Sequence, residues 1–351
     1  MAAPALTAEA ALERAREAGI HCLRIPTPFA VGRVNCYLLE DEPLTLVDTG
    51  PNSGKALDEL QRQLAERGHS IDDLELVILT HQHIDHLGLV EIIAEHSGAE
   101  VAAIDVAVER LANFGENSEE EDRFAGELMQ RCGIPENVVI ALQGVSRSFR
   151  GWGSKARVTR PLRDGERLKL RDRTLEVLHR PGHSPSDTVF WDEQRRILIA
   201  ADHLIKHISS NPLINRPLDG SPGRTKALVS YLDSLRRTRE MPAEIVLSGH
   251  GEPITDHVAL IDERIEMTAR RKEKIFDLIA EQPRSGHELA QALWGDVAVT
   301  QAFLTLSEVI GHVDLLADEG RVREASDGEV TRFETTGAVA ASNEATGRGT
   351  G

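Results

Sequence analysis

The chain has 351 residues, 40% of them hydrophobic, and a formal net charge of −17. This length suits two domains, and the hydrophobic content is ordinary for a soluble globular protein. The negative charge argues against nucleic acid as a partner of the whole chain, because phosphate contacts require Lys and Arg.

The chain carries no pattern of a membrane or secreted protein. No apolar run approaches the roughly 18 residues that span a bilayer, and residues 1–18 lack a basic segment followed by an apolar one. The three cysteines, Cys22, Cys36 and Cys132, are odd in number and widely spaced, which fits reduced thiols. We therefore expect a cytoplasmic protein with no membrane partner.

The N-terminal part of the chain is predicted to begin with a helix and continue with strands. The helix occupies residues 8–18, in an N-terminal segment of residues 1–19. Short apolar or alternating runs predict strands at residues 20–25, 35–40, 44–47 and 76–79. After the third strand, Ser53 can cap a helix that Gly68 ends.

The stretch after the fourth strand, Thr80 to Gly88, has the most unusual composition in the chain. It places His81, His83, Asp85 and His86 within six positions. A purely structural role would require all four polar side chains to be satisfied in one short loop. Imidazole and carboxylate are ligands of zinc, iron and manganese, so we predict a metal site here.

Asp48 stands at the end of the third predicted strand, before Thr49 and Gly50. Open α/β sheets bind ligands at the carboxyl ends of their strands. We expect Asp48 to orient a metal-bound histidine or water. The alternative is a turn Asp that hydrogen-bonds its own backbone.

Three later strands also end in metal-type residues. His183 follows a strand at residues 174–179, and further strands are predicted at residues 188–192, 196–200 and 244–247. Asp202 follows the strand at residues 196–200, and His250 follows the strand at residues 244–247. One such histidine would usually be a turn residue, but together with the first cluster they supply the ligands for two metal ions. His207 follows Asp202 closely enough to reach a substrate; a surface role is the alternative.

Two segments inside this region differ in character. Residues 105–149 read as a helical insertion, a candidate lid, with helices at 106–113 and 121–132 joined by an acidic loop, 116–122, that we expect to be solvated. Residues 147–173 hold ten Lys and Arg against three Asp and Glu. They form either an exposed surface or a patch that holds a phosphorylated substrate.

The C-terminal part, residues 266–334, has the outline of a winged helix. After a long helix at 256–280 come helices at 288–293 and 301–319, then a hairpin. This outline does not indicate nucleic-acid binding, because residues 284–334 hold four Arg and no Lys against ten Asp and Glu. We expect the segment to serve packing, dimerisation or a wall of the active site. Residues 335–351 are predicted to be disordered.

The motif from Thr80 to His86, followed by His183, Asp202 and His250, resembles the metallo-β-lactamase superfamily. The resemblance implies an αββα sandwich over about residues 20–260, within a catalytic domain that we place at residues 20–265. It also implies a dinuclear site at one edge of the sandwich. The C-terminal helices resemble, less specifically, the branch that contains the lactamase-beta-like mitochondrial endoribonuclease.

The resemblance also implies the ligand set. One ion would take His81, His83 and His183, and the other Asp85, His86 and His250, with Asp202 bridging them. Zinc is the expected metal, with iron and manganese as alternatives. Two such ions lower the pKa of a shared water toward about 7, and the resulting bridging hydroxide attacks the substrate. Asp85 is also a candidate proton acceptor.

The expected reaction is hydrolysis of a small-molecule acyl thioester such as an acyl-CoA, whose phosphates the Arg-rich segment could hold. Glyoxalase II-type thioesterases share the metal motif but carry a different C-terminal domain. The alternatives are a phosphodiesterase or endoribonuclease and a lactonase or esterase. A secreted β-lactamase, an iron redox protein and a binding protein with a dead site fit less well, and a homodimer stays open.

Overall fold

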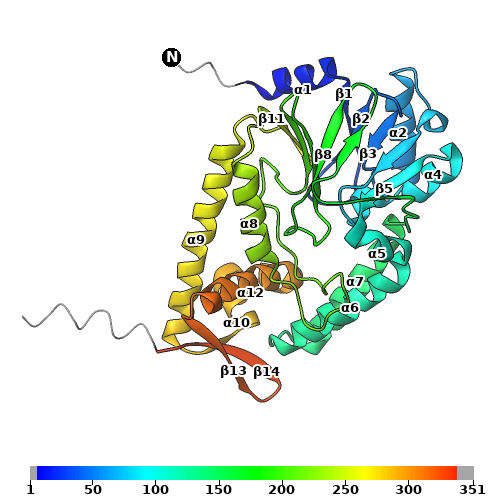
Figure 1. The fold of residues 1–351 in the computed structure, drawn as a ribbon. Coiled ribbons are helices and arrows are strands. Elements are labelled where there is room, and N and C mark those ends of the chain that lie inside the picture. Colours follow the sequence, from blue (N-terminus) through cyan, green and yellow to red (C-terminus); the bar gives the residue numbers. More distant parts are fainter. Residues whose placement is uncertain (1–5, 338–351) are drawn as a thin grey trace, which may run out of the picture.

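The computed structural model describes residues 6–337. Two mixed β-sheets face each other, with helices on their outer sides (Figure 1). This is the αββα sandwich that the metal motif predicted. Among the described helices, none is both long and apolar enough to cross a membrane.

The first sheet has six strands in the spatial order β1-β2-β3-β4-β5-β6. Its first three strands are antiparallel neighbours, and β3 to β6 run parallel. Helices α1, α2 and α4 pack on it through buried residues such as Ala11, Leu60 and Ile93. The strands are β1 (Ile20–Ile25), β2 (Val34–Leu39), β3 (Thr45–Val47), β4 (Leu76–Ile78), β5 (Glu100–Ile104) and β6 (Arg160–Leu162). The helices are α1 (Ala8–Glu17), α2 (Gly54–Ala65), α3 (Ile84–Leu87) and α4 (Val90–Ser97), with a 3-10 turn at Ile71–Asp73.

The second sheet has five strands in the order β11-β10-β9-β8-β7. In β10, Ile197 and Ile199 belong to the core between the sheets. Leu198 and Ala200 pack instead with the outer helices α8 and α9, as the two-residue period of a strand requires. The elements are β7 (Arg167–Lys169), β8 (Thr174–His179), β9 (Thr188–Asp192), β10 (Ile197–Ala201), β11 (Ile245–Ser248), α8 (Ala227–Arg239) and α9 (His257–Glu281).

Residues 105–149 are helical, but the predicted acidic loop is wrong. Helix α6 runs through it from Phe114 to Arg131, between α5 (Val108–Ala112) and α7 (Glu136–Phe149). Its carboxylates are not simply solvated, since Glu121 pairs with Arg110 and Asp122 with Arg150. Short 3-10 turns at Asp105–Ala107 and Arg150–Trp152 flank the insertion.

The C-terminal module, residues 266–334, contains the end of α9, three further helices and a three-stranded sheet in the order β12-β14-β13. The elements after α9 are β12 (Arg284–Ser285), α10 (Gly286–Trp294), α11 (Val297–Thr300), α12 (Ala302–Asp318), β13 (Val322–Asp327) and β14 (Val330–Thr335). Thr335, predicted to begin the tail, pairs with Val322 as the last residue of β14. Residues 338–351 of the predicted tail lie outside the described residues.

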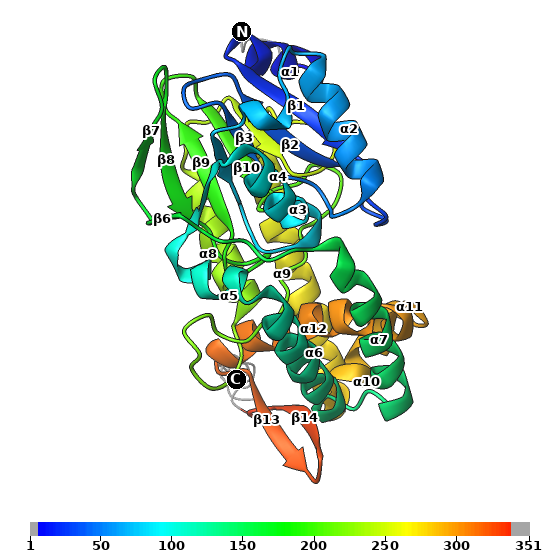
Figure 2. The same cartoon turned by 90° about the vertical axis from the view of Figure 1, so that its right-hand side faces the viewer.

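The insertion and the C-terminal module lie side by side next to the sandwich (Figures 1 and 2). They share one hydrophobic core, in which Leu128 and Met129 of α6 lie with Leu306 and Ile310 of α12. Two segments that are far apart in the sequence therefore form one helical body beside the sheets.

Candidate metal centre

All seven predicted ligands meet at one edge of the sandwich, and each follows a strand. The loop after β4 carries His81, His83, Asp85 and His86, while β8, β10 and β11 are followed by His183, Asp202 and His250, respectively. Three overlapping groups of these side chains have their ligand atoms within 4.8 Å of one another. The members are His81, His83 and His183 in the first group, Asp85, His86 and His250 in the second, and His81, His86 and Asp202 in a third that overlaps the other two.

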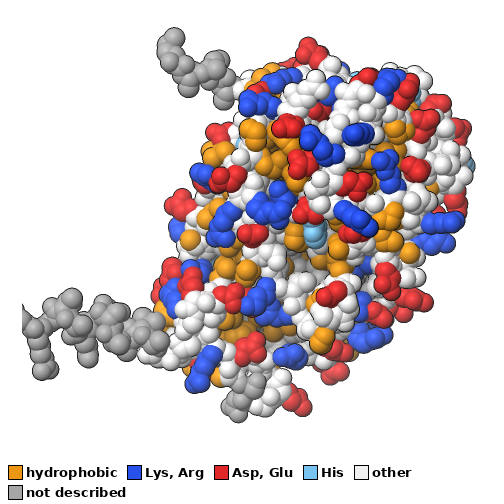
Figure 3. Space-filling model, in the orientation of Figure 1, with side chains coloured by type: hydrophobic (Ala, Val, Ile, Leu, Met, Phe, Trp, Pro, Cys, Tyr) orange, Lys and Arg blue, Asp and Glu red, His pale blue; other side chains and the backbone are white. Residues whose placement is uncertain are grey.

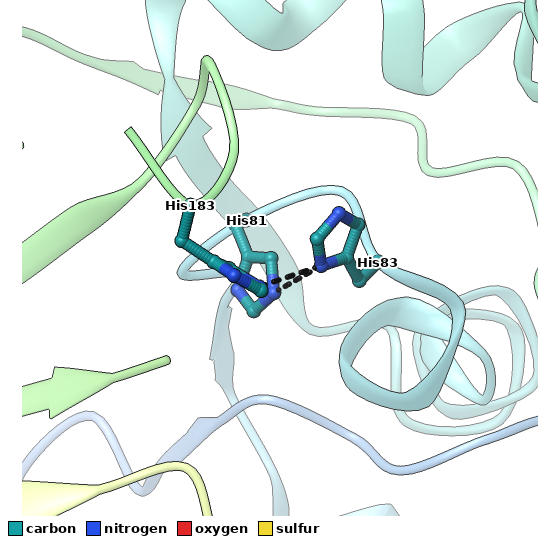
Figure 4. A group of neighbouring side chains, drawn as sticks. All are labelled: His81, His83 and His183. Atoms are coloured by element: carbon teal, nitrogen blue, oxygen red, sulfur yellow. Dashed lines mark hydrogen bonds between the residues drawn. The ribbon is translucent and has the colours of Figure 1, made fainter. Parts of the chain in front are cut away.

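The three histidines of the first group, His81, His83 and His183, point toward one another (Figure 4). Nδ1 of His83 lies 3.1 Å from Nε2 of His81 and 2.9 Å from Nε2 of His183. A tetrahedral zinc with nitrogen ligands at about 2.0–2.1 Å holds those atoms about 3.3 Å apart. Burial lowers the pKa of His83 to about 3 and that of His81 well below its usual value. Both rings are therefore neutral at pH 7, which is the form that binds metal.

Asp85, His86 and His250 make the second group, and Asp202 lies between the two groups. Nε2 of His250 is 3.3 Å from Oδ2 of Asp85. The Asp202 carboxylate lies 3.4 Å from Nε2 of His86, 3.5 Å from that of His250 and 3.6 Å from that of His183. One carboxylate therefore reaches both groups, as a bridging ligand must.

Several of these atoms are buried without a hydrogen bond. Within residues 6–337, Nε2 of His86, Nε2 of His250 and Oδ1 of Asp202 have no hydrogen-bond partner. A buried polar atom left in this way costs about 1–3 kcal/mol. Burial alone would raise the pKa of Asp202, but His86 and His250 hold it well below the usual value, so this carboxylate is ionised. The neutral rings of His81 and His83, the ionised carboxylate of Asp202 and the unsatisfied ligand atoms fit a pair of divalent ions. Burial alone would lower the pKa of His86 and His250, but the neighbouring carboxylates raise that of His86 well above its usual value and that of His250 to about 9, so both rings must lose a proton before they can bind metal.

Asp48 contacts the second group through the ring nitrogen of His86 that faces away from Asp202. Its Oδ2 accepts a hydrogen bond from Nδ1 of His86 at 2.8 Å, and its Oδ1 accepts one from the backbone N–H of Thr80 at 2.9 Å. This leaves Nε2 of His86 facing Asp202. Asp48 has a φ of 58°, a left-handed conformation that Asp tolerates better than most residues. The contacts suit the predicted orienting role.

The residues that hold the His250 loop in place were not predicted from the sequence. Asn35 and Tyr37 of β2 both donate side-chain hydrogen bonds to the Ser248 carbonyl, at 2.9 and 2.6 Å. Nδ1 of His250 donates to the carbonyl of Arg33 at 2.9 Å. A Cβ on Gly249 would lie 2.1 Å from Oδ1 of Asp202, so only glycine fits there. The one available signal was Asn35, a polar residue inside an apolar strand.

A cavity of about 680 Å³ opens onto the site. Five of the predicted ligands are among its lining residues, namely His83, Asp85, His183, Asp202 and His250. Its walls expose mainly apolar atoms and come from the loop after β1, the insertion, the segment after Asp202 and the C-terminal module. Besides the predicted ligands, the charged side chains in the lining are Arg110, Glu121, Asp122 and Arg150. The apolar lining residues are Phe29, Val31, Ile84, Leu111, Phe114, Phe149, Ile205, Ile208, Leu213 and Leu304.

Two predicted features lie away from this cavity. His207 is exposed, and its ring lies against Gly251 rather than among the lining residues. Of the ten basic residues in 147–173, only Arg150 lines the cavity, where it pairs with Glu119 and Asp122. The others are dispersed; Arg173, for example, is buried against Asp41. The Arg-rich segment is therefore not gathered into a phosphate site at the cavity.

The fold and the site together define an αββα protein with a His/Asp centre suited to two metal ions. The chain belongs to the metallo-beta-lactamase superfamily, whose family model matches residues 30–250. It is 34% identical over 313 residues to the probable metallo-hydrolase YqjP of Bacillus subtilis, covering 89% of this chain and 97% of that one. A metal-dependent hydrolase is the activity that these relatives support.

The likeness to solved structures extends beyond the catalytic domain. The metallo-beta-lactamase family protein TTHA1429 of Thermus thermophilus matches with a TM-score of 0.73 and 27% identity, over 90% of this chain and 98% of that one. Two more distant relatives carry substrate names. The hydroxyacylglutathione hydrolase GloC of Haemophilus influenzae is 27% identical over 65% of this chain and 90% of its own. The bovine acyl-coenzyme A thioesterase MBLAC2 is 28% identical over 48% of this chain and 58% of its own.

Proposed function

We propose that this protein is a dinuclear metal-dependent hydrolase of acyl thioesters, such as acyl-CoA. The observation that carries the proposal is the mainly apolar cavity of about 680 Å³ that five of the predicted metal ligands line. Each buried CH₂ of an acyl chain would contribute roughly 0.8 kcal/mol to binding. The names of two relatives, GloC and MBLAC2, support the same substrate class.

In this proposal His81, His83 and His183 would hold one ion and Asp85, His86 and His250 the other, and the Asp202 carboxylate, which lies near residues of both groups, would serve as a shared ligand. We propose zinc, although iron and manganese suit the same donors. Divalent ions bound there supply a Lewis acid and a source of hydroxide near neutral pH.

The chain's own groups orient the substrate and move protons. The apolar walls would align the acyl chain and keep bulk water from it. Asp85 lines the cavity, and nearby His86 and His250 hold its pKa below the usual value although burial raises it. Its ionised carboxylate is the proposed proton acceptor, and Asp48 is proposed to hold His86 in place.

Phosphodiester cleavage is the weaker candidate because a nucleic acid needs a basic track. Acidic and basic side chains are interspersed across the face in Figure 3. We also propose that α9, β12, α10, α12, β13 and β14 form a winged-helix-like module. Its recognition helix would be α12, but most of α12 is buried, including His312, so this helix is not free to enter a groove. The cytoplasmic location and the homodimer stay predictions.

The test compares two substrates on one preparation. Thiol release is measured on acyl-CoA esters of increasing chain length, and cleavage of single-stranded RNA is measured in parallel, each with and without a chelator. We expect metal-dependent thiol release that rises with chain length until the cavity is filled. His83→Ala should abolish it, whereas His96→Ala, on the exposed side of α4, should not. RNA cleavage without thiol release would overturn the assignment.

A further inference from the structure

The connection between β10 and α8 runs through residues 202–226 without a helix or strand. Connections of this length inside a compact domain usually have a function. Its residues 210–214, which we call the strap, contact His183 on one side and helix α12 of the C-terminal module on the other.

The strap fixes the orientation of a predicted metal ligand. Nδ1 of His183 donates to the backbone carbonyl of Asn211 at 3.2 Å, and the N–H of Leu213 donates to the carbonyl of His183 at 3.4 Å. Since Nδ1 carries the proton, Nε2 is free to face His83 and Asp202. Nearby, the hydroxyl of Ser210 donates to the carbonyl of Asp202 at 2.5 Å.

The same short segment is attached to α12. Nδ2 of Asn211 donates to the carbonyl of Leu304 at 3.3 Å, and the N–H of Ile214 donates to Oγ of Ser307 at 3.3 Å. Ile214 and Ser307 are buried, and Ile214 belongs to the hydrophobic core that contains Leu306. Asn211 therefore contacts the predicted ligand His183 through its backbone carbonyl and helix α12 through its side-chain amide.

We propose that Asn211 is a positioning residue that couples α12 to the metal ligand His183. Its side-chain amide fixes the peptide whose carbonyl sets the tautomer and the ring orientation of His183. Partners of this kind typically change metal affinity by about 10–100-fold when they are lost. The inference rests on the metal set of the proposed function but not on its substrate.

The test measures metal binding in the full-length protein and needs no substrate. Metal-free protein is titrated with cobalt(II) in competition with a chromophoric chelator, and the visible absorption of the bound cobalt is recorded. Asn211→Ala removes the amide, and Asn211→Leu removes it while keeping the volume. Both variants should lower the affinity for one of the two cobalt ions by about tenfold and change the absorption spectrum of that ion. The affinity for the other ion should stay as in the wild type.

Asp219→Ala is the matched control, because Asp219 lies in the same connection, is exposed, and accepts a hydrogen bond from the backbone N–H of nearby Ser221. It should leave both affinities and the spectrum unchanged. A merely structural role for Asn211 would lower the melting temperature of the metal-free protein without a selective loss of one ion. That result, or wild-type cobalt binding in both Asn211 variants, would overturn the proposal.

Discussion

The carboxylate of Asp48 accepts a hydrogen bond from Nδ1 of His86 at 2.8 Å, and both side chains are buried. The two residues are 38 positions apart and follow neighbouring parallel strands, β3 and β4. Their contact leaves Nε2 of His86 to face Asp202 in the candidate metal centre. It also ties the metal loop to the adjacent strand end through Thr80.

Asp48→Asn should weaken metal binding without unfolding the protein. Asp48 accepts from the Thr80 N–H with one oxygen and from His86 with the other. Asn has only one acceptor oxygen, so one of these donors would face an NH₂ group, although Asn tolerates the left-handed backbone. We expect about a 10–100-fold loss of metal affinity, measured by chelator competition. Wild-type affinity would show that Asp48 does not orient the site.

The buried ion pair between Arg173 and Asp41 should stabilise the sandwich independently of the metals. The side chains are 2% and 0% exposed and 2.9 Å apart. Asp41→Ala would leave the Arg173 charge buried without a partner and should cost about 3–5 kcal/mol in the free energy of unfolding, measured with urea. Asp172→Ala, which removes an exposed carboxylate, should cost less than about 1 kcal/mol.

The stabilisation by Asp41 should depend on pH. Burial alone would raise its pKa, but hydrogen bonds from Arg173 and from the backbone hold it below the usual value of about 3.9. A carboxyl with a depressed folded-state pKa stabilises the protein above the unfolded pKa. The difference in stability between wild type and Asp41→Ala should therefore be full above about pH 4 and shrink as the pH falls further. A difference that grows on acidification would contradict the pairing.

Leu304 of the C-terminal module should limit the length of the substrate. Its side chain is 38% exposed and lines the cavity. Leu304→Trp should lower kcat/KM for long acyl thioesters by about tenfold or more and affect short ones less, because the larger ring fills apolar space. Val299→Trp is the control, since Val299 is 36% exposed on α11 outside the cavity. Equal effects of the two changes on all chain lengths would show that Leu304 does not select the substrate.

A catalytic role for His207 stays a prediction, and His207→Ala tests it directly. The ring lies beside Gly251, next to the His250 loop. A side chain that transfers a proton typically raises the reaction rate by about 10²–10⁴-fold. If His207 has this role, its loss should lower kcat by about 100-fold or more and change the pH profile of the reaction. A variant with unchanged kcat and pH profile would assign His207 to the surface.

The sequence allowed several strand ends to be predicted, and it marked the His and Asp side chains that follow them as candidate ligands, because each of these features depends on local chemistry. Strands β1 and β8 have the predicted ends, and Ser53 caps α2 by accepting from the N–H of Ala56. The histidines and aspartates of the metal groups stood out because they follow apolar strands. Their assembly at one edge was expected from the family motif rather than from the spacing of residues.

Apart from helix α8, whose helical period is a local signal, the missed features depend on contacts between distant segments. Helix α8 was not predicted, although its buried Leu228, Tyr231 and Leu235 follow a helical period. The acidic run in α6 was taken for a loop because its partners, Arg110 and Arg216, lie elsewhere in the chain. The proposed role of Asn211 could not be predicted from the sequence, since it depends on the positions of both α12 and His183.

Metal content tests the central claim most directly. The number of divalent ions per chain is measured by mass spectrometry for wild type and for His83→Ala, with hydrolysis followed on the same samples. We predict two divalent ions per wild-type chain, with zinc as the expected metal. His83→Ala should lose metal and at least about 100-fold of the activity, with an unchanged circular dichroism spectrum. Iron in the wild type would reopen the redox alternative, and a metal-free His83→Ala protein with full activity would contradict the dinuclear account.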